Sequence, residues 1–346
     1  MSTITEPYLS VNKAVDQSQV AVIIPTFNAR KHWPVLSTGL RIQGLRASQV
    51  LIVDSSSDDG TDELALAEGY RVVRIERRDF NHGGTRRLAL DFVPWASVVV
   101  YLTQDVALAT SDSLDRLLSA FEDENVAAAY GRQLPRPAAG PIEAHARLFN
   151  YPSRSEIRDF ESRHTLGIKA AFLSNSFAAY RVKKLLEVGC FPSDAIISED
   201  ALATGKLLLA GWKVAYIAEA QVYHSHSLSI MDEFRRYFDI GVCHRHEQWL
   251  PEQFGGPACE GERFVASEMS YLMHHSPHLM PVALIRTASK ALGYQLGLRS
   301  VELGRGWSRR LSFHKSFWDR PTGERKEMSE VSAGLEISAS GPTPRS

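Results

Sequence analysis

The sequence has few cysteines, and it lacks the long apolar runs and the strong net charge that mark several classes of protein. Its three cysteines lie far apart and form no Cys-x-x-Cys pair, so no disulfide framework is expected and a reducing cytoplasm is favoured. No apolar run approaches the roughly 20 residues of a membrane span. Residues 1–19 lack the basic-then-apolar pattern of a signal peptide. A net charge of −1 gives no sign of nucleic-acid binding.

The sequence does contain short apolar runs that alternate with helical stretches. These β-branched runs predict buried strands at residues 20–24, 50–53, 71–75 and 98–102. Stretches typical of helices lie between several of them, and this alternation indicates βαβ units and a parallel sheet. Further on, residues 131–165 contain four prolines and are expected to be irregular. The chain is therefore predicted to have an α/β fold.

Polar side chains follow three of the predicted strands. The run at 98–102 ends abruptly in Thr103, Gln104 and Asp105. A carboxylate at the carboxyl end of a buried parallel strand lies where open α/β sheets bind ligands. We therefore expect Asp105 to lie next to a metal-bound phosphate. After the first strand, Thr26 and Asn28 can bond neighbouring backbone or a ligand. Small polar residues at 54–61 suit a turn whose side chains and amides face a ligand.

Three further motifs carry residues that could take part in chemistry, and each also has an ordinary structural explanation. The paired glycines and arginines of 81–87 suit a close approach of the backbone to phosphate, or an ordinary loop with a helix cap. Glu199 and Asp200 precede an apolar helix, where acidic residues are electrostatically favoured in any case. His224 follows a strand, and a lone histidine is usually structural.

In their order along residues 20–226, these motifs resemble those of family 2 glycosyltransferases with the GT-A fold. The matching segments are 24–28, 53–61, 81–86, the strand end at Asp105, 174–177, 199–200 and Gly211. The segments 80–86 and 102–105 resemble the bacterial rhamnosyltransferases that assemble O-antigen and other surface polysaccharides. The resemblance implies a Rossmann-like, mostly parallel central sheet flanked by helices, a dTDP-L-rhamnose donor, and a glycan acceptor on a lipid carrier.

The metal motif of this family is reduced in the sequence. The family usually carries Asp-x-Asp at the strand end, whereas Thr103 stands at the first position here. Mg²⁺ tolerates the loss, because it usually takes one or two carboxylates and keeps several waters. The resemblance also allows His224 to supply a second protein ligand beside Asp105, and an imidazole would favour Mn²⁺. A divalent cation, Mg²⁺ or Mn²⁺, is therefore expected.

The resemblance assigns roles in an inverting transfer of a sugar. Asp200 would be the general base, and Glu199 would be either the alternative base or the residue that orients Asp200. Asn175 and Ser176 would lie on the acceptor side. The donor-binding residues would be Pro25, Thr26, Phe27, Asn28, Asp54, Ser56, Asp58, Asn81, His82, Gly83, Arg86, Gln104 and Asp105.

There are three alternatives to this function. A nucleotidyltransferase would need a glycine-rich, lysine-containing signature after the first strand, and residues 25–30 lack it. A non-catalytic protein that binds sugar nucleotides or glycans would explain the missing aspartate, but it would not require Asp200. A glycosyltransferase that uses another NDP-sugar is the third alternative. The retained carboxylates favour an enzyme.

The expected organisation has four parts. A flexible leader (1–19) precedes the glycosyltransferase domain (20–228), a helical C-terminal region (229–322) and a disordered tail (323–346). Residues 281–320 carry eight positive and two negative charges, interleaved with Trp307, Phe313, Phe317 and Trp318. This pattern predicts either contact with an anionic membrane surface or a solvated helix packed on the core. The protein is expected in the cytoplasm, where it could lie on the inner face of the plasma membrane and form a homo-oligomer.

Overall fold

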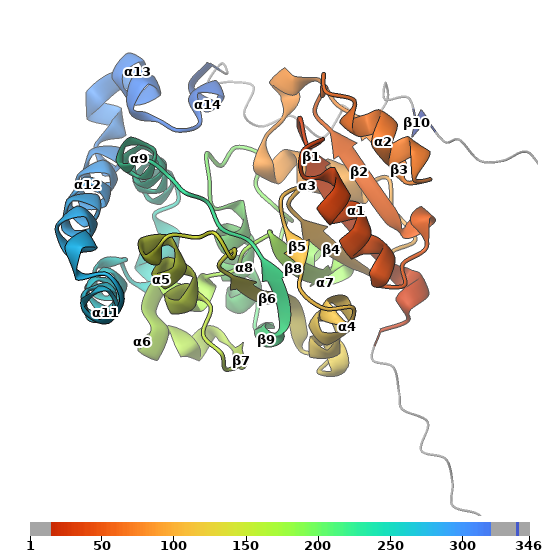
Figure 1. The fold of residues 1–346 in the computed structure, drawn as a ribbon, viewed down its shortest axis with the longest axis horizontal. Coiled ribbons are helices and arrows are strands. Elements are labelled where there is room, and N and C mark those ends of the chain that lie inside the picture. Colours follow the sequence, from red (N-terminus) through yellow and green to blue (C-terminus); the bar gives the residue numbers. More distant parts are fainter. Residues whose placement is uncertain (1–14, 320–336, 339–346) are drawn as a thin grey trace, which may run out of the picture.

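A mixed sheet organises the protein in the computed structural model, which describes residues 15–319 and 337–338 (Figure 1). The strands lie in the order β10-β3-β2-β1-β4-β8-β6-β9-β5, and β7 pairs with β9. Their bounds are β1 Val20–Thr26, β2 Val50–Asp54, β3 Arg71–Arg74, β4 Val98–Leu102, β5 Ala107–Leu108, β6 Val126–Leu134, β7 Glu156–Arg158, β8 Phe177–Arg181, β9 Lys213–Tyr223 and β10 Ile337–Ser338. The four strands predicted from apolar runs are β1 to β4.

Helices cover both faces of this sheet. Their bounds are α1 Trp33–Ile42, α2 Thr61–Ala67, α3 His82–Leu90, α4 Ser113–Leu118, α5 Pro141–Asn150, α6 Arg163–Leu166, α7 Val182–Glu187, α8 Glu199–Leu209, α9 Ile230–His246, α10 Trp249–Phe254, α11 Ala258–His275, α12 Met280–Leu298, α13 Ser300–Leu311 and α14 Lys315–Asp319. Alternate side chains of β1 divide the core. Ala21 and Ile23 belong to one cluster with residues of α3, α7 and α8. Val20, Val22 and Ile24 belong to another with residues of α1, α2 and α4.

The parallel part of the sheet brings the predicted loops to one edge. β1 pairs in parallel with both β2 and β4, and Thr26 lies opposite Asp54 at the ends of β1 and β2. β8 then runs antiparallel between β4 and β6. The segment before β8 therefore lies at the same edge as the carboxyl end of β4, where Leu102 pairs with Phe177.

The expectation that residues 131–165 are irregular is wrong. β6 continues to Leu134, and the segment also contains α5, β7 and most of α6. Pro141 is the first residue of α5, a position where proline is favoured because the first amides of a helix lack intrahelical acceptors. Proline at this position therefore begins a helix and does not interrupt one.

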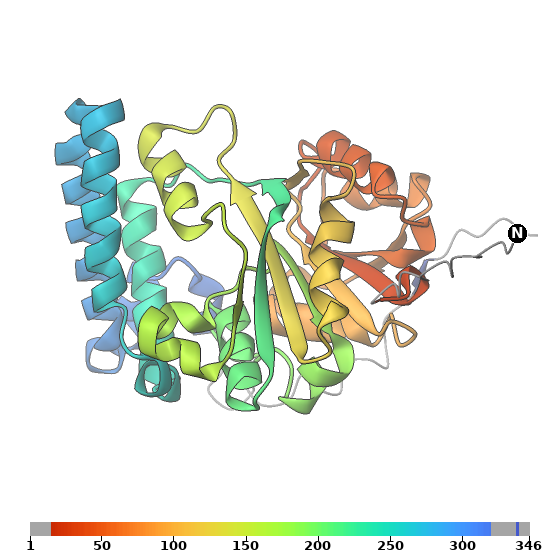
Figure 2. The ribbon, with the colours of Figure 1, turned by 90° about the horizontal axis from the view of Figure 1, so that it is seen from below.

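The helical C-terminal region is present. α11 and α12 lie side by side at the end of the molecule away from β1 to β3 (Figure 2). Between α9 and α12, a Cβ atom on Gly297 would lie 2.1 Å from the carbonyl oxygen of Phe238, so glycine permits this close packing. Within the described chain, no helix is long and apolar enough to cross a membrane. Most of the predicted leader and tail lies outside the described residues.

Candidate active site

The loops after β1 and β2 are joined around the buried carboxylate of Asp54. Its Oδ1 accepts hydrogen bonds from the hydroxyls of Thr26 (3.0 Å) and Ser57 (2.6 Å), and its Oδ2 accepts one from the Ser57 amide (2.8 Å). The Asn28 side chain accepts from the amide of Asp58 at 3.0 Å. The predicted donor-binding segments after β1 and β2 are thus held together by hydrogen bonds, and both carboxylate oxygens of Asp54 already accept hydrogen bonds within them.

Backbone conformation at this edge is unusual. Asn28 (φ 48°), Ser56 (φ 58°) and Ser198 (φ 66°) all adopt the left-handed region, which is strained for residues other than glycine. Each of the three lies in or beside a predicted site segment.

The side chain of Gln104 accepts a hydrogen bond from the Phe27 amide (2.7 Å) and donates one to the Phe27 carbonyl (3.0 Å). This exchange fixes the loop after β4 against the loop after β1.

Asp105 lies in a cluster of metal-ligating side chains. The Nε2 atoms of His224 and His226 are each 3.3 Å from Asp105 Oδ2. The ligand atoms of the three residues lie within 4.8 Å of one another. Burial lowers the pKa of both histidines, that of His226 to about 4, so both imidazoles are neutral at pH 7. One carboxylate and two neutral imidazoles form a donor set that suits a divalent transition-metal ion.

His226 was not among the predicted ligands, although the sequence held a signal for it. In extended backbone, residues two apart point to the same side, so His224 and His226 are placed to act together beyond the end of β9. A positive group also approaches the cluster, since Arg136 lies 3.6 Å from Asp105 Oδ2. Burial raises the pKa of Asp105, but its contacts with His224 and His226 outweigh this effect and hold that pKa below its ordinary value.

The glycine-rich turn forms the start of α3. Asn81 caps the helix by accepting from the Gly84 amide at 2.5 Å. A Cβ atom on Gly83 would lie 1.9 Å from the carbonyl oxygen of Pro192, so this glycine is required for packing against the loop before α8. The His82 ring contacts the ring of His314 edge to face, with centroids 5.2 Å apart.

The contact with His314 brings the C-terminal region into the site, which the sequence did not indicate. The amides of Phe313 and His314 donate to Asp239 on α9, at 3.0 and 2.9 Å. This anchor holds the segment between α13 and α14 against α3. The contact joins residues far apart in the chain, so the local sequence pattern does not predict it.

Glu199, at the start of α8, is held by two partners. Its Oε1 lies 2.9 Å from Arg86 Nη1 and accepts from the Asn175 side chain at 3.2 Å. All three side chains are buried. Burial alone would raise the pKa of Glu199, but the charge of Arg86 outweighs it and holds that pKa below its ordinary value. Glu199 is therefore ionised and fixed in place.

Asp200 has a different environment from its neighbour. Its Oδ2 accepts from the Asn175 amide at 3.2 Å, and its Oδ1 accepts from the amide of Ala201. Burial and then the negative charge of Glu199 raise the pKa of Asp200 to about 7. A carboxylate with a pKa near neutrality can take up a proton at physiological pH.

The segment before β8 connects this carboxylate with the metal-ligating cluster. Asn175 contacts both Glu199 and Asp200, and the neighbouring Ser174 accepts from Gln133 at 2.9 Å. Gln133 in turn contacts His224. Asn175 and Ser176 were the predicted acceptor-side residues, and their segment lies between Asp200 and the cluster around Asp105.

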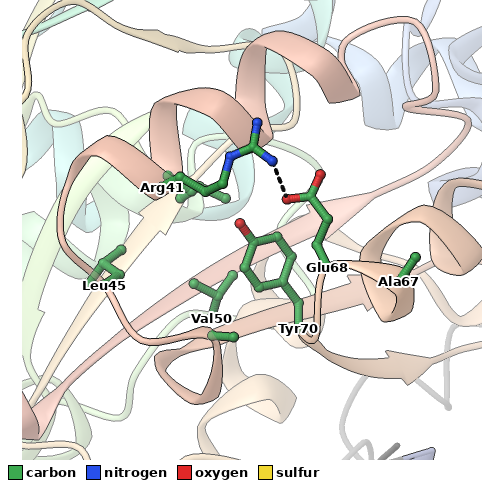
Figure 3. A pocket seen from close by; sticks show the side chains of 8 residues that line it. Arg41, Leu45, Val50, Ala67, Glu68 and Tyr70 are labelled. Carbon is green, nitrogen blue, oxygen red and sulfur yellow. Dashed lines mark hydrogen bonds and ion pairs between the residues drawn. The ribbon is translucent and has the colours of Figure 1, made fainter.

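A hollow elsewhere on the molecule is separate from this site. Figure 3 shows it between α1, α2 and the start of β2, with Val50 and Tyr70 inside and an ion pair between Arg41 and Glu68 at 3.5 Å. Val50 begins β2, whereas Asp54 ends it. The hollow thus lies at the opposite edge of the sheet from the predicted site.

Comparison with known proteins gives the family. Residues 21–189 match the model of glycosyl transferase family 2. The O-antigen chain rhamnosyltransferase RfbN of Salmonella typhimurium is 42% identical over 302 residues, which cover 87% of this chain and 96% of that protein. This chain belongs to glycosyl transferase family 2. WbaN of Salmonella anatum, which has the same description, is 42% identical over 86% of this chain and 95% of its own length.

The solved structures support the fold. The mannosyltransferase PcManGT from Pyrobaculum calidifontis, in complex with GDP-Man and Mn²⁺, has a TM-score of 0.51 at 19% identity and covers 88% of each chain. At this identity the likeness concerns the fold alone. The expected GT-A fold, the assignment as a glycosyltransferase and the resemblance to bacterial rhamnosyltransferases are confirmed. A metal-ligating group that includes the predicted Asp105 and His224 is also present.

Proposed function

We propose that this glycosyltransferase moves L-rhamnose from dTDP-L-rhamnose onto a lipid-linked or polysaccharide acceptor, with inversion at the anomeric carbon. The donor assignment is supported by the 42% identity to two proteins described as O-antigen chain rhamnosyltransferases. The observation that carries the mechanism is Asp200, a carboxylate with a pKa near 7 that a hydrogen-bonded segment connects to a metal-ligating cluster.

In this mechanism Asp200 accepts the proton of the acceptor hydroxyl. The hydroxyl oxygen forms a bond to the anomeric carbon, while the bond from that carbon to the diphosphate oxygen breaks and dTDP leaves with the electron pair. Asp105, His224 and His226 would hold Mg²⁺ or Mn²⁺, which when bound offsets negative charge on the departing diphosphate. Glu199 orients Asp200 and raises its pKa. Because attack occurs opposite the leaving group, a single displacement inverts the centre.

The remaining predicted residues are proposed to bind or frame the donor. Asp54 and Gln104 would act by fixing the loops that receive the nucleoside, since their polar atoms already bind neighbouring groups. Arg86, whose charge is paired with Glu199, would position the start of α3. The other proposed donor-side residues are Pro25, Thr26, Phe27, Asn28, Ser56, Asp58, Asn81, His82 and Gly83.

A thermal-shift panel tests the donor and the metal together. We expect dTDP with Mn²⁺ or Mg²⁺ to raise the melting temperature, because a ligand at 100 times its Kd adds about 2.7 kcal/mol to stability. UDP, GDP and CDP serve as matched controls and should have smaller effects. A shift with UDP or GDP instead would keep the glycosyltransferase and discard rhamnose as the donor. If no nucleotide shifts the melting temperature, the alternative of a non-catalytic binding protein replaces this proposal.

We also propose that the enzyme lies in the cytoplasm on the inner face of the plasma membrane, which it contacts through α12 and α13. Two of the four aromatic residues predicted to take part, Phe317 and Trp318, are buried in the core, so they cannot contribute. Trp307 is 60% exposed and Phe313 45% exposed. They lie among exposed basic residues whose charge complements anionic lipids, namely Arg299, Arg305, Arg310 and Lys315, whereas the charge of Arg309 is paired with Asp319 at 2.6 Å.

The arrangement of α12 supports this contact. Its basic residues turn inward, where Arg286 (3.0 Å) and Lys290 (3.4 Å) pair with Glu233 on α9. Its outward face is apolar over several turns, with Val282, Leu284, Ile285 and Leu292 exposed. Because the charges of α12 point toward α9, its outward face is apolar and uncharged. Such a face is more stable against the apolar part of a membrane than in water.

Replacing two outward side chains of α12 should weaken membrane binding. Ile285→Gln with Leu292→Gln is expected to lower partition onto phosphatidylglycerol–phosphatidylcholine vesicles at least about 30-fold, because burying each side chain contributes more than ~1 kcal/mol. Val35→Gln, at an equally exposed apolar position on α1, is the matched control. Unchanged partition of the double variant would rule out this contact. A change from dimer to monomer on gel filtration would instead assign the face to a second copy of the chain.

A further inference from the structure

We infer that Gln133 and Arg147 are positioning residues of the proposed cation site, because they fix the tautomer in which His224 faces Asp105. The inference rests on the proposed function, which places a divalent cation among Asp105, His224 and His226. Neither Gln133 nor Arg147 belongs to any motif identified in the sequence. They come from β6 and α5, and α5 lies in the segment that was expected to be irregular.

The side chain of Gln133 makes three polar contacts and is 1% exposed. Its Oε1 lies 2.8 Å from Nδ1 of His224 and accepts a hydrogen bond from Arg147 Nη1, also at 2.8 Å. Its Nε2 donates to the hydroxyl of Ser174 at 2.9 Å. All the polar atoms of the amide are therefore engaged in one network.

Arg147 determines which way this amide points. A guanidinium group only donates hydrogen bonds, so the atom of Gln133 that faces it must be the carbonyl oxygen. The reversed amide would place an NH₂ group against the guanidinium and lose this bond. Ser174 can accept from the amide nitrogen on the other side, in agreement with the same orientation. The orientation thus follows from the chemistry of the neighbours.

The orientation of the amide then sets the tautomer of His224. Because the carbonyl oxygen of Gln133 only accepts, Nδ1 of His224 must carry a hydrogen atom. In a neutral imidazole the other nitrogen, Nε2, then presents a lone pair. That lone pair lies 3.3 Å from Asp105 Oδ2, which is also an acceptor. Two acceptors that face each other at this distance are stabilised by a cation that binds both.

A residue that orients a metal-ligating histidine usually raises the affinity of the site for its metal ion. Removing such a partner typically lowers metal affinity 10–100-fold, because the ring and its tautomer are no longer fixed. Gln133 and Arg147 together provide this function for His224. Among the three proposed ligands, Gln133 makes its hydrogen bond to His224, so its effect acts through that residue, whereas the charge of Arg147 also lowers the pKa of His226.

Titration calorimetry with Mn²⁺ alone tests the inference without any sugar transfer. Gln133→Leu removes the acceptor for Nδ1–H and should raise the Kd for Mn²⁺ about 10–100-fold. Gln133→Glu keeps an acceptor for both His224 and Arg147, so it should bind Mn²⁺ at least as tightly as the wild type. Arg147→Met frees the amide to rotate and should weaken binding less than Gln133→Leu. Melting curves identify which variants are folded.

A second readout reports the tautomer directly. In the metal-free protein, ¹⁵N spectra should show His224 protonated at Nδ1, and Arg147→Met should show a mixture of tautomers even if Gln133→Leu does not fold. Wild-type affinity in Gln133→Leu, or His224 protonated at Nε2 but not at Nδ1 in the wild type, would overturn the inference alone. Failure of the wild-type protein to bind Mn²⁺ would overturn the cation site of the proposed function as well.

Discussion

Asp200→Asn is expected to lower kcat at least about 10²-fold, since removing a general base commonly costs 10²–10⁴ in rate. The substitution hardly changes the shape of the side chain. An amide oxygen can still accept from the Asn175 backbone at the present 3.2 Å, whereas the bond from the Ala201 amide is lost. Losing one hydrogen bond costs about 1 kcal/mol, which should leave the protein folded. The affinity for dTDP should therefore stay at the wild-type value in a thermal-shift titration. The amide can no longer take up the proton of an acceptor hydroxyl.

The pH dependence of the wild-type rate is part of the same prediction. Because the pKa of Asp200 is raised to about 7 and the base acts in its ionised form, kcat/KM should rise with pH and level off above about 7. Asp194→Asn, an exposed aspartate in the loop before α8, is the matched control and should keep the full profile. Turnover of Asp200→Asn near the wild-type rate would remove Asp200 from the mechanism.

The strand ends of the site were predictable because buried strands have a strong local signal. The apolar run of β4 and the polar residues after it placed Asp105 at the carboxyl edge of the sheet, and the structure brings two histidines to it. The order of the motifs along the chain then indicated the glycosyltransferase family. These features depend on residues that are near one another in sequence, which is why a single sequence shows them.

Features formed by residues distant in the chain were not predictable. Arg86 and Glu199 are more than a hundred positions apart, and the sequence around either residue does not predict their ion pair. The contact of His314 with His82 has the same origin. On α12, composition showed both basic and apolar residues, but only packing against α9 shows that the charges point inward. Tertiary packing determines these contacts and the direction of these side chains, and the local sequence pattern does not contain that information.

Breaking the buried ion pair of Arg86 and Glu199 should destabilise the fold strongly. Arg86 is 4% exposed and Glu199 6% exposed, and their charged atoms lie 2.9 Å apart. Arg86→Met removes the cation and leaves a buried carboxylate beside Asp200. Breaking a buried pair from one side typically costs about 3–5 kcal/mol, because the remaining charge is uncompensated. Urea unfolding should show this loss of stability as a lower midpoint.

A double variant separates the charge from the packing in this prediction. Arg86→Met with Glu199→Gln removes both charges, so it should recover most of the lost stability, whereas Arg87→Met, at the exposed neighbouring arginine, should have little effect. The charge of Arg86 also lowers the pKa of Asp200, so any folded Arg86→Met protein should have its rate profile shifted to higher pH. A single variant as stable as the wild type, with an unshifted profile, would show that this pair neither holds α3 to α8 nor tunes Asp200.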